Sequence, residues 1–414
     1  MSERQAERQD LQGRRIVLGL SGGIACYKSA ELVRLLTRHG ADVRVVMTPA
    51  AESFITAVTM QALSGHPVVT SQWDTREPNN MPHINLGRWA EAIVIAPASA
   101  DLMAQLVQGR SDELLSLLCL ARPRETCALL VAPAMNREMW SHPATQRNVA
   151  QLRLDGTRIL GPDAGDQACG EVGDGRMLEA EELLDELIAH FQPKVLAGRS
   201  LLITAGPTFE PIDPVRGITN HSSGKMGFAM ARAAAEMGAQ VTLVAGPVHL
   251  PTPRGVARVN VTTAQQMHDV VLPQAASHEV FIATAAVADW RPATLNAHKI
   301  KKDGKKAAPT FELTENPDIL AAVAGLPQPP YCVGFAAESE NLLEHARAKL
   351  VRKKLPLIVG NMGPATFGRD DNSLLVVDAD SHRSLPADGS TADKRTLARE
   401  LMHDIAARLR AAGR

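Results

Sequence analysis

Residues 216–227 combine residue types that suit the binding of phosphate. The segment reads Arg-Gly-Ile-Thr-Asn-His-Ser-Ser-Gly-Lys-Met-Gly and lies where a strand pattern gives way to a helix pattern. Backbone N–H groups at the start of a helix have no partner within the helix and can hold phosphate oxygens. The segment therefore predicts a nucleotide site. It is not a Walker-type loop, because six residues separate Gly217 from Gly224 and no Ser or Thr follows Lys225.

A second glycine turn, Ser21-Gly22-Gly23-Ile24, follows an apolar strand pattern and opens a helix pattern that ends near His39. Its glycines allow close approach of a ligand to the backbone, and the helix start offers a partial positive charge to a phosphate. Such turns also occur without ligands. Phosphate binding and simple chain reversal are therefore equal alternatives for this feature taken alone.

Two polar side chains in the first half are candidates for acid–base work and for carboxylate binding. His83 is expected on a loop before a strand, where it is either a base or carboxylate ligand or an inert surface histidine. Asn136 follows an apolar strand pattern, so its amide is expected at the carboxyl end of a strand, with donors that suit a carboxylate. The alternative is that the neighbouring methionines and tryptophan only fill core space.

The chain has five cysteines and no Cys-x-x-Cys pair, which argues against a zinc site and against a disulfide scaffold. Cys119 and Cys127 lie among leucines and are predicted to be buried. Cys169 begins a charged segment with three glycines that runs to Met177. We expect this segment to be a flexible loop, and a cysteine on such a loop is a candidate proton donor or nucleophile.

Three features of the second half suit a nucleotide. Asp289 ends an apolar run and is expected either to touch a ribose or a metal-bound phosphate or to cap a helix. Phe335 ends another strand pattern, where it either flanks a base or packs in the core. A basic run is either a solvated loop or a mobile segment that closes over a triphosphate. The run consists of Lys299, Lys301, Lys302, Lys305 and Lys306.

The elements that must position these residues alternate along the chain. Short apolar runs typical of buried strands are separated by segments with apolar residues at helical spacing. The pattern restarts after a helix pattern at 179–191 and a short linker at Pro193, so we expect domains at 1–192 and 193–414. Such alternation predicts open, mostly parallel sheets with helices on both faces and ligands at the carboxyl ends of the strands.

The composition limits the classes of partner. At 414 residues the chain exceeds the usual size of one hydrophobic core, which also favours two domains. A net charge of -1 gives no surface-wide attraction for nucleic acid or for an anionic membrane. The first 15 residues are polar and no apolar run reaches about 18 residues, so neither secretion nor membrane insertion is predicted and the expected location is the cytoplasm.

The motifs of the first half resemble those of the flavin-dependent cysteine decarboxylases, specifically the phosphopantothenoylcysteine decarboxylases. They are the Ser21 turn, His83, the segment 96–100, the segment 133–140 and the segment 168–177. The resemblance implies His83 as the residue that assists oxidation and decarboxylation, Asn136 as the ligand of the substrate carboxylate, and Cys169 as the acid that protonates the reduced intermediate. Flavin oxidation of the substrate thiol would provide the electron sink for loss of carbon dioxide. The implied FMN is held by Ser21, Gly22, Gly23, Ile24, Ala96 and Ser99.

The motifs of the second half resemble, in order and spacing, the phosphopantothenate–cysteine ligases. The resemblance implies that the phosphopantothenate carboxylate attacks CTP to give an acyl-cytidylate, and that the cysteine amine then forms the amide and releases CMP. It implies Asn220 at the acyl intermediate and Mg²⁺ carried mainly by the triphosphate, with Asp289 as its one protein contact. One departure is Met362, which stands after Asn361 where an acidic residue is expected. The implied CTP site comprises Ser222, Ser223, Gly224, Asp289, Lys299, Lys301, Lys302 and Phe335.

Together the resemblances cover nearly the whole chain and indicate the bifunctional enzymes of coenzyme A biosynthesis, acting on 4'-phosphopantothenate, cysteine and CTP. They imply two doubly wound, Rossmann-like α/β domains, the first flavodoxin-like, and a homo-oligomer of trimeric decarboxylase and dimeric ligase domains, up to a dodecamer. One alternative is a two-domain NAD-type dehydrogenase, but neither half contains Gly-x-Gly-x-x-Gly with an acidic residue about 20 positions on. The other is a catalytically degenerate flavoprotein regulatory subunit, which the presence of His83, Asn136 and Cys169 disfavours.

Overall fold

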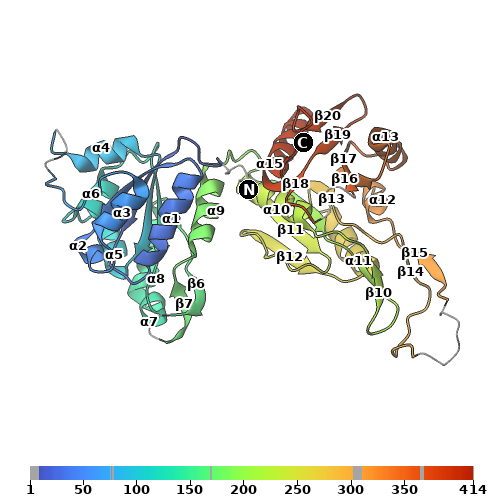
Figure 1. The fold of residues 1–414 in the computed structure, drawn as a ribbon, viewed down its shortest axis with the longest axis horizontal. Helices are drawn as coiled ribbons and strands as arrows, with labels where there is room; N and C mark the ends of the chain where they lie inside the picture. The colour runs from blue at the N-terminus through green and yellow to red at the C-terminus, as the bar shows by residue number, and fades with distance from the viewer. Residues whose placement is uncertain are drawn as a thin grey trace, which may run out of the picture. The chain divides into compact units, whose positions relative to one another are not determined.

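The computed structural model describes residues 9–74, 76, 79–167, 170–301, 310–363 and 368–413. The chain divides into two compact units, Met1–Phe191 and Gln192–Arg414 (Figure 1). Each unit contains a sheet with helices on both faces, as the alternating sequence patterns predict. The predicted fold class of two mostly parallel, Rossmann-like α/β domains is confirmed.

The first unit is built on a five-stranded parallel sheet in the order β2-β1-β3-β4-β5. Ile16 pairs with Val43 on one side and with Ala92 on the other, so β1 lies between β2 and β3. Because the chain leaves β1 for one side and returns on the other, the sheet has a switch point between β1 and β3 at the carboxyl ends of these strands. The strands are β1 (Arg15–Leu20), β2 (Asp42–Met47), β3 (Ala92–Ala98), β4 (Ala128–Pro133) and β5 (Arg158–Ile159).

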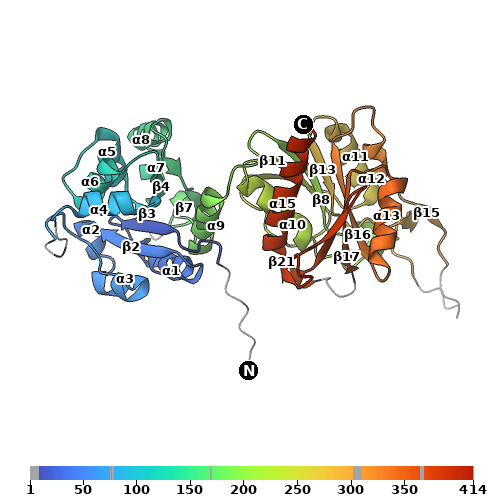
Figure 2. The ribbon, with the colours of Figure 1, turned by 90° about the horizontal axis from the view of Figure 1, so that it is seen from above.

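Two hydrophobic cores cover the faces of this sheet, because successive side chains of a strand point to opposite faces. Leu18 faces the core formed with α1, α3 and α9, whereas Val17 faces the core formed with α4, α5, α6 and α8 (Figure 2). The helices are α1 (Cys26–Arg38), α2 (Pro49–Glu52), α3 (Ala57–Ser64), α4 (Pro82–Trp89), α5 (Ala100–Gln108), α6 (Leu114–Ala121), α7 (Arg137–Ser141), α8 (Pro143–Leu154) and α9 (Ala180–Phe191).

An antiparallel hairpin of β6 (Asp163–Asp166) and β7 (Val172–Arg176) follows the sheet. The sequence prediction of a flexible loop is therefore wrong for residues 172–176. Gly175 has a φ of +123°, and a Cβ atom at this position would lie 2.4 Å from the Met135 carbonyl oxygen. This glycine thus permits close packing of the strand on the backbone after β4.

The second unit contains an eight-stranded sheet in the order β12-β11-β8-β13-β16-β17-β19-β20. The first six strands are parallel, and β19 and β20 extend the sheet in antiparallel fashion. A switch point lies between β8 and β13. The strands are β8 (Ser200–Ala205), β11 (Gln240–Ala245), β12 (Val256–Asn260), β13 (Val280–Ala283), β16 (Tyr331–Glu338), β17 (Leu357–Met362), β19 (Leu374–Val377) and β20 (His382–Leu385).

Helices α10 and α15 cover one face of this sheet, and α11, α12 and α13 cover the other (Figure 2). The start of α10 packs directly on the strand ends, because a Cβ atom at Gly227 would lie 2.3 Å from Thr284 Oγ1 and 2.5 Å from Ala205 Cβ. The helices are α10 (Lys225–Glu236), α11 (Ala264–Ala275), α12 (Ile319–Ala324), α13 (Leu342–Arg352) and α15 (Lys394–Ala411).

Three short antiparallel pairs lie outside the sheets of the second unit, and the sequence patterns do not predict them. Strands of two or three residues are too short to show a period of two. The pairs are β9 (Phe209–Pro211) with β10 (Gly217–Thr219), β14 (Trp290–Pro292) with β15 (Leu313–Glu315), and β18 (Asp371–Asn372) with β21 (Ala392–Asp393). Across the part of the chain that the structure describes, no helix is long and apolar enough to cross a membrane.

Candidate functional site

The turns after β1 and β3 are joined at the switch point of the first sheet. The buried hydroxyl of Ser21 donates to the Pro97 carbonyl oxygen (2.8 Å) and accepts from the Ser99 backbone N–H (2.8 Å). Ser99 also caps α5, because its hydroxyl accepts from the Leu102 N–H (3.2 Å). The glycine turn that leads into α1 and the start of α5 therefore meet where a doubly wound sheet binds its ligand.

The other residues predicted to hold the cofactor differ in their surroundings. Ala96 is buried in β3, and its carbonyl oxygen accepts a hydrogen bond from the Ser29 hydroxyl of α1 (2.6 Å). Gly22 packs against Ala50, where a Cβ atom would lie 2.7 Å from the alanine Cβ. Ile24 is 63% exposed, so it offers an apolar surface beside the switch point. Ala96 therefore packs inside the protein beside the site, whereas the exposed side chain of Ile24 can contact a ligand directly.

His83 lies in α4 and not on a loop, so the sequence prediction of its element is wrong. Pro82 is in the first turn of the helix, where its missing N–H costs no hydrogen bond. The His83 Nδ1 atom is buried and has no hydrogen-bond partner among the described residues. Buried polar atoms without partners are rare in proteins. The imidazole therefore has an unused nitrogen that a bound molecule can engage.

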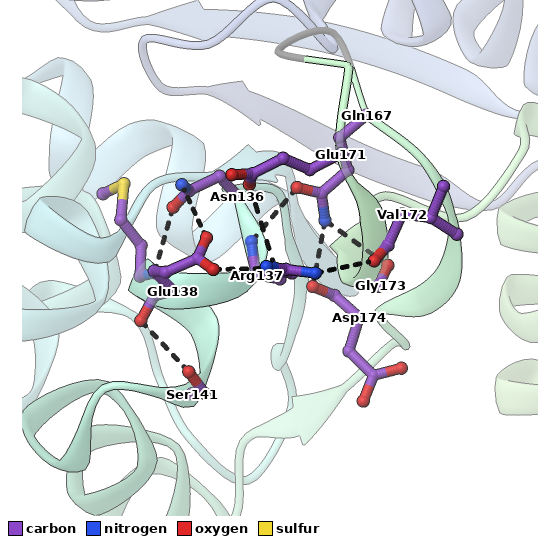
Figure 3. Close-up of polar contacts among 10 residues, drawn as sticks. Asn136, Arg137, Glu138, Ser141, Gln167, Glu171, Val172, Gly173 and Asp174 are labelled. Carbon is purple, nitrogen blue, oxygen red and sulfur yellow. Dashed lines mark hydrogen bonds and ion pairs between the residues drawn. The ribbon is translucent and has the colours of Figure 1, made fainter.

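Asn136 follows β4 and caps the start of α7 (Figure 3). Its Oδ1 atom accepts a hydrogen bond from the Met139 backbone N–H (3.0 Å), while its Nδ2 atom donates to Glu138 Oε2 (3.2 Å). Because the capping hydrogen bond needs an acceptor, it identifies one end of the amide as the oxygen and the other end as the N–H donors. The Asn136 amide thus presents N–H groups to a carboxylate, and that carboxylate belongs to Glu138 in this structure.

A network of hydrogen bonds joins the Asn136 turn to the hairpin of β6 and β7 (Figure 3). Gln167 Oε1 accepts from the Arg137 backbone N–H (3.1 Å), and Gln167 Nε2 donates to the Asp174 carbonyl oxygen (3.0 Å). The Met135 backbone N–H donates to the Gly175 carbonyl oxygen (3.0 Å). The hairpin that flanks Cys169 is therefore held against the Asn136 turn. Cys169 itself lies outside the described residues.

Burial raises the pKa values of three cysteines of the first unit, so their thiols are not reactive. Burial raises the pKa of Cys26 to about 11, that of Cys119 to about 12 and that of Cys127 to about 11. The prediction that Cys119 and Cys127 are buried is confirmed. These thiols are protonated at neutral pH and are poor nucleophiles.

The second unit has a cavity of about 610 Å³ at the carboxyl ends of β8, β13 and β16. Five of the residues predicted to bind a nucleotide line it: Ser222, Ser223, Gly224, Asp289 and Phe335. Lys225, from the predicted segment 216–227, also lines it. The sequence analysis did not assign a role to the other cationic and amide side chains that line it, namely Lys349, Lys353, Lys394, Asn316, Asn361 and Asn372.

Several of these missed side chains form ion pairs at the rim of the cavity. Lys353 Nζ lies 2.8 Å from Asp318 Oδ2, and Lys349 Nζ lies 2.6 Å from Glu338 Oε1. Burial acts to raise the pKa of Asp318, but the Lys353 ammonium and the Ala321 N–H hold it below its usual range. Lys349 lies in α13 and Lys353 directly follows its last residue, and a lysine in or next to a helix gives no sequence signal that it faces a cavity rather than water.

Asn220, Lys299 and Lys301 are not among the described residues that line the cavity. Asn220 lies next to it, because its Nδ2 atom donates to the Ala286 carbonyl oxygen (2.5 Å) and its Oδ1 atom accepts from the Ser222 N–H (3.0 Å). The amide therefore ties the turn before α10 to the turn after β13. Lys302 lies outside the described residues.

The Asp213 carboxylate joins the segment before β10 to the segment at the start of the basic run. Its buried carboxylate accepts hydrogen bonds from the Arg216 guanidinium (2.5 and 3.1 Å), from the Val215 N–H (2.8 Å) and from the Ile300 N–H (3.2 Å). The Arg216 guanidinium beside it is the main reason that the pKa of Asp213 lies far below its usual range. Arg216 also donates to the Ile300 carbonyl oxygen (3.0 Å), so this charge pair joins the segment before β10 to Lys299 and Lys301.

No group of three or more His, Cys, Asp or Glu residues in the described ranges is arranged to hold a metal ion. Asp289 lines the cavity, as do the carboxylates Glu315 and Asp318. Met362 is partly exposed at the end of β17 and lines a different cavity of about 350 Å³ together with Arg369 and Asp371. Its neighbour Asn361 is the residue of this pair that faces the larger cavity.

Sequence similarity covers both units. Residues 4–192 match the family described as Flavoprotein, and residues 196–409 match the family described as DNA/pantothenate metabolism flavoprotein C-terminal domain. The chain is 50% identical over 401 residues to the Vibrio cholerae protein named Coenzyme A biosynthesis bifunctional protein CoaBC, which spans 96% of this chain and 99% of that protein. Proteins of this name from Escherichia coli and Bacillus subtilis are 50% and 40% identical, over 91% and 96% of this chain and 93% and 98% of their own lengths.

The chain belongs to the CoaBC family. A solved structure described as the C-terminal domain of Coenzyme A biosynthesis bifunctional protein CoaBC is 36% identical and covers 53% of this chain and 99% of its own, with a TM-score of 0.43. The FMN binding protein AtHal3 is 30% identical and covers 44% of this chain and 99% of its own, with a TM-score of 0.38. Membership in the CoaBC family makes this chain a flavoprotein and does not favour the dehydrogenase or the regulatory subunit.

Proposed function

We propose that the chain catalyses two consecutive steps of coenzyme A biosynthesis. The second unit joins cysteine to 4'-phosphopantothenate with CTP, through an acyl-cytidylate, and the first unit decarboxylates the resulting 4'-phosphopantothenoylcysteine to 4'-phosphopantetheine. The observation that carries the proposal is that the chain matches bifunctional relatives over almost its full length. The cavity at the carboxyl ends of strands of the second unit supports it.

In the first unit, the Ser21 turn and Ser99 hold FMN at the switch point, with Gly22, Gly23, Ile24 and Ala96 around it. The fit rests on the joined helix starts, which suit a phosphate, and on the orphaned nitrogen of His83. Bound there, FMN would supply reversible hydride transfer at the substrate carbon that carries the thiol, with no net oxidation.

The side chains of the first unit orient the substrate and move protons. Asn136 Nδ2 takes the substrate carboxylate in place of Glu138, and the cap at Oδ1 keeps the donors turned toward it. The unused Nδ1 of His83 accepts the thiol proton during oxidation. Cys169 returns a proton to the reduced intermediate. The hydrogen bonds of Gln167 hold the Asn136 turn and the hairpin of β6 and β7 in one geometry for these steps.

In the second unit, CTP occupies the cavity lined by Ser222, Ser223, Gly224 and Asp289, with Phe335 beside the base. The lysine run that includes Lys299, Lys301 and Lys302 neutralises the triphosphate, which also carries Mg²⁺. Asn220, in the turn before α10 and bonded to the turn after β13, donates to the acyl carbonyl oxygen of the intermediate. The cysteine amine then attacks that carbon, CMP leaves, and the amine proton passes to solvent.

The protein takes only small-molecule substrates in this proposal, and it assembles as a homo-oligomer of trimeric first units and dimeric second units. Two measurements test the proposal. Purified protein has the visible absorption of bound FMN, or gains it when FMN is added. A mixture of protein, CTP, cysteine, 4'-phosphopantothenate and Mg²⁺ releases CMP and carbon dioxide in equal amounts. A protein that binds no FMN and releases neither product contradicts the proposal.

A further inference from the structure

Two lysines stand at one end of the cavity of the second unit. Lys225 is the first residue of α10 and Lys394 is the first residue of α15, and both side chains line the cavity. The two helices pack side by side on the same face of the sheet (Figure 2). Two helix N-termini with partial positive charge thus meet two ammonium groups at this point.

The oxygen atoms of one short segment surround both ammonium groups. Lys225 Nζ donates to the Gly368 carbonyl oxygen (2.9 Å) and to Asp370 Oδ1 (2.7 Å). Lys394 Nζ donates to the Arg369 carbonyl oxygen (2.5 Å). Carbonyl and carboxylate oxygens are the kind of acceptor that phosphate oxygens can replace.

Lys394 is only 8% exposed, which is uncommon for a lysine. Burial lowers the pKa of its ammonium, and the positive charge of Lys225 lowers it further. A bound polyanion would relieve both effects, because it supplies negative charge between the two ammonium groups. A hydrophobic residue would fill this position at the start of α15 at lower cost if packing alone were required.

We propose that Lys225 and Lys394 bind the β- and γ-phosphates of the nucleoside triphosphate and stabilise pyrophosphate as it leaves. This inference rests on the proposed function. In the step concerned, a carboxylate oxygen of the substrate forms a bond to the α-phosphorus, and the bond from that phosphorus to the oxygen bridging to the β-phosphate breaks. The bridging oxygen keeps the electron pair and departs on pyrophosphate, whose growing charge meets the two ammonium groups. The segment 368–370 holds the lysines in place when no nucleotide is bound.

Inhibition by inorganic pyrophosphate is the direct test, with Lys225→Met and Lys394→Met in the full-length protein. Each variant should raise the inhibition constant of pyrophosphate and the KM for CTP about tenfold, because each loses one charge-assisted hydrogen bond. The KM for cysteine and the decarboxylation of supplied 4'-phosphopantothenoylcysteine should not change. Arg410→Met is the matched control, since it removes a positive charge from the exposed far end of α15 and should leave all four quantities unchanged.

An unchanged inhibition constant for pyrophosphate in both methionine variants would overturn the inference. A uniform loss of all activities would also overturn it, because a merely structural role predicts that result. Lys225→Met carries the test if Lys394→Met unfolds, since the Lys225 side chain is partly exposed. Wild-type protein that makes no pyrophosphate from CTP and 4'-phosphopantothenate contradicts the proposed function itself. If the wild-type protein is active and both variants behave like it, only the proposed role of the two lysines is contradicted.

Discussion

At the scale of single residues, the surroundings of Asn136 assign the two ends of its amide. The cap to the Met139 N–H needs an acceptor, so Oδ1 faces the helix and Nδ2 faces outward toward Glu138. Aspartate caps helices as well as asparagine does but has no N–H group. A single substitution therefore separates the structural role of this residue from its proposed role in binding the substrate carboxylate.

Asn136→Asp should lower decarboxylation of 4'-phosphopantothenoylcysteine about 100-fold or more, because it removes a donor to a carboxylate and adds a like charge. Steady-state assays of carbon dioxide release measure this effect. FMN content should match the wild type and thermal unfolding should change only slightly, since the cap is kept and the bond lost to Glu138 is exposed. Wild-type turnover in this variant would show that Asn136 does not bind the substrate carboxylate.

A second residue-scale prediction concerns the buried thiols. The raised pKa values of Cys26, Cys119 and Cys127 keep less than about 1% of each as thiolate at pH 8. Iodoacetamide should therefore leave these three unmodified in the native protein, as mass spectrometry of digested peptides can show. The same reagent in guanidinium chloride should label all five cysteines of the chain. Rapid native labelling of any of the three would contradict their burial.

At the scale of elements, the Asp213–Arg216 pair joins two segments of the second unit that are far apart in sequence. Asp213→Asn should lower ligation about tenfold, because the position of the segment at Ile300 depends on this charge pair. Decarboxylation should be unchanged, and Asp269→Asn, on the exposed face of α11, serves as the control. Equal ligation by both variants would contradict the positioning role.

The same pair has a defined pH dependence. The folded-state pKa of Asp213 is depressed, so its stabilising effect is fully present above the unfolded-state pKa of about 4 and is lost as the pH falls through the folded-state value. The difference in unfolding free energy between wild type and Asp213→Asn should therefore be the same at pH 5 and pH 7.5 in urea titrations. A difference that shrinks between pH 7.5 and pH 5 would show that the carboxylate is not held in its ionised form.

Helix α1 and the segment between β7 and α9 are joined by a buried lysine. Lys28 is 5% exposed, and its Nζ atom donates to the Met177 carbonyl oxygen (2.8 Å) and to Glu179 Oε1 (2.9 Å). Lys28→Met should destabilise the first unit by about 1–3 kcal/mol, because it leaves a buried carbonyl without its donor. Urea unfolding measures the loss, with Arg34→Met on the exposed face of the same helix as the control. Equal stability of the two variants would contradict the importance of this bond.

The elements differ in how far the sequence predicts them. The apolar runs of β3 and β16 and the glycine turn before α1 give clear patterns, and the structure places these elements where the patterns do. His83 was harder to place, because α4 has only eight residues and begins directly at Pro82. Lys353 directly follows α13 and Lys394 begins α15, and at the ends of such helices lysine is normally solvated. Only the order of the strands brings them to the cavity, and one-dimensional periodicity does not contain that order.

At the scale of the whole molecule, Phe191 and Lys194 flank the boundary between the two units, and each makes a contact within its own unit. Phe191 stacks under the Arg14 guanidinium within the first unit, at 4.8 Å from the ring centroid. Lys194 donates to the Glu236 carbonyl oxygen within the second unit (2.6 Å). Fragments 1–191 and 192–414 should therefore fold separately, the first with decarboxylase activity and the second with ligase activity. Thermal unfolding and separate assays test this, and a fragment that is unfolded or inactive would contradict the division.

The central claim is that two separate sites in one chain perform consecutive reactions, and one set of assays tests it most directly. Wild type, Asn136→Asp and Asn220→Asp are each given CTP, cysteine and 4'-phosphopantothenate, and CMP, carbon dioxide and 4'-phosphopantothenoylcysteine are measured together. Asn136→Asp should release CMP and accumulate 4'-phosphopantothenoylcysteine without carbon dioxide. Asn220→Asp should release little CMP, yet it should decarboxylate supplied 4'-phosphopantothenoylcysteine at the wild-type rate. If either substitution abolishes both reactions in folded protein, the account of two independent sites is wrong.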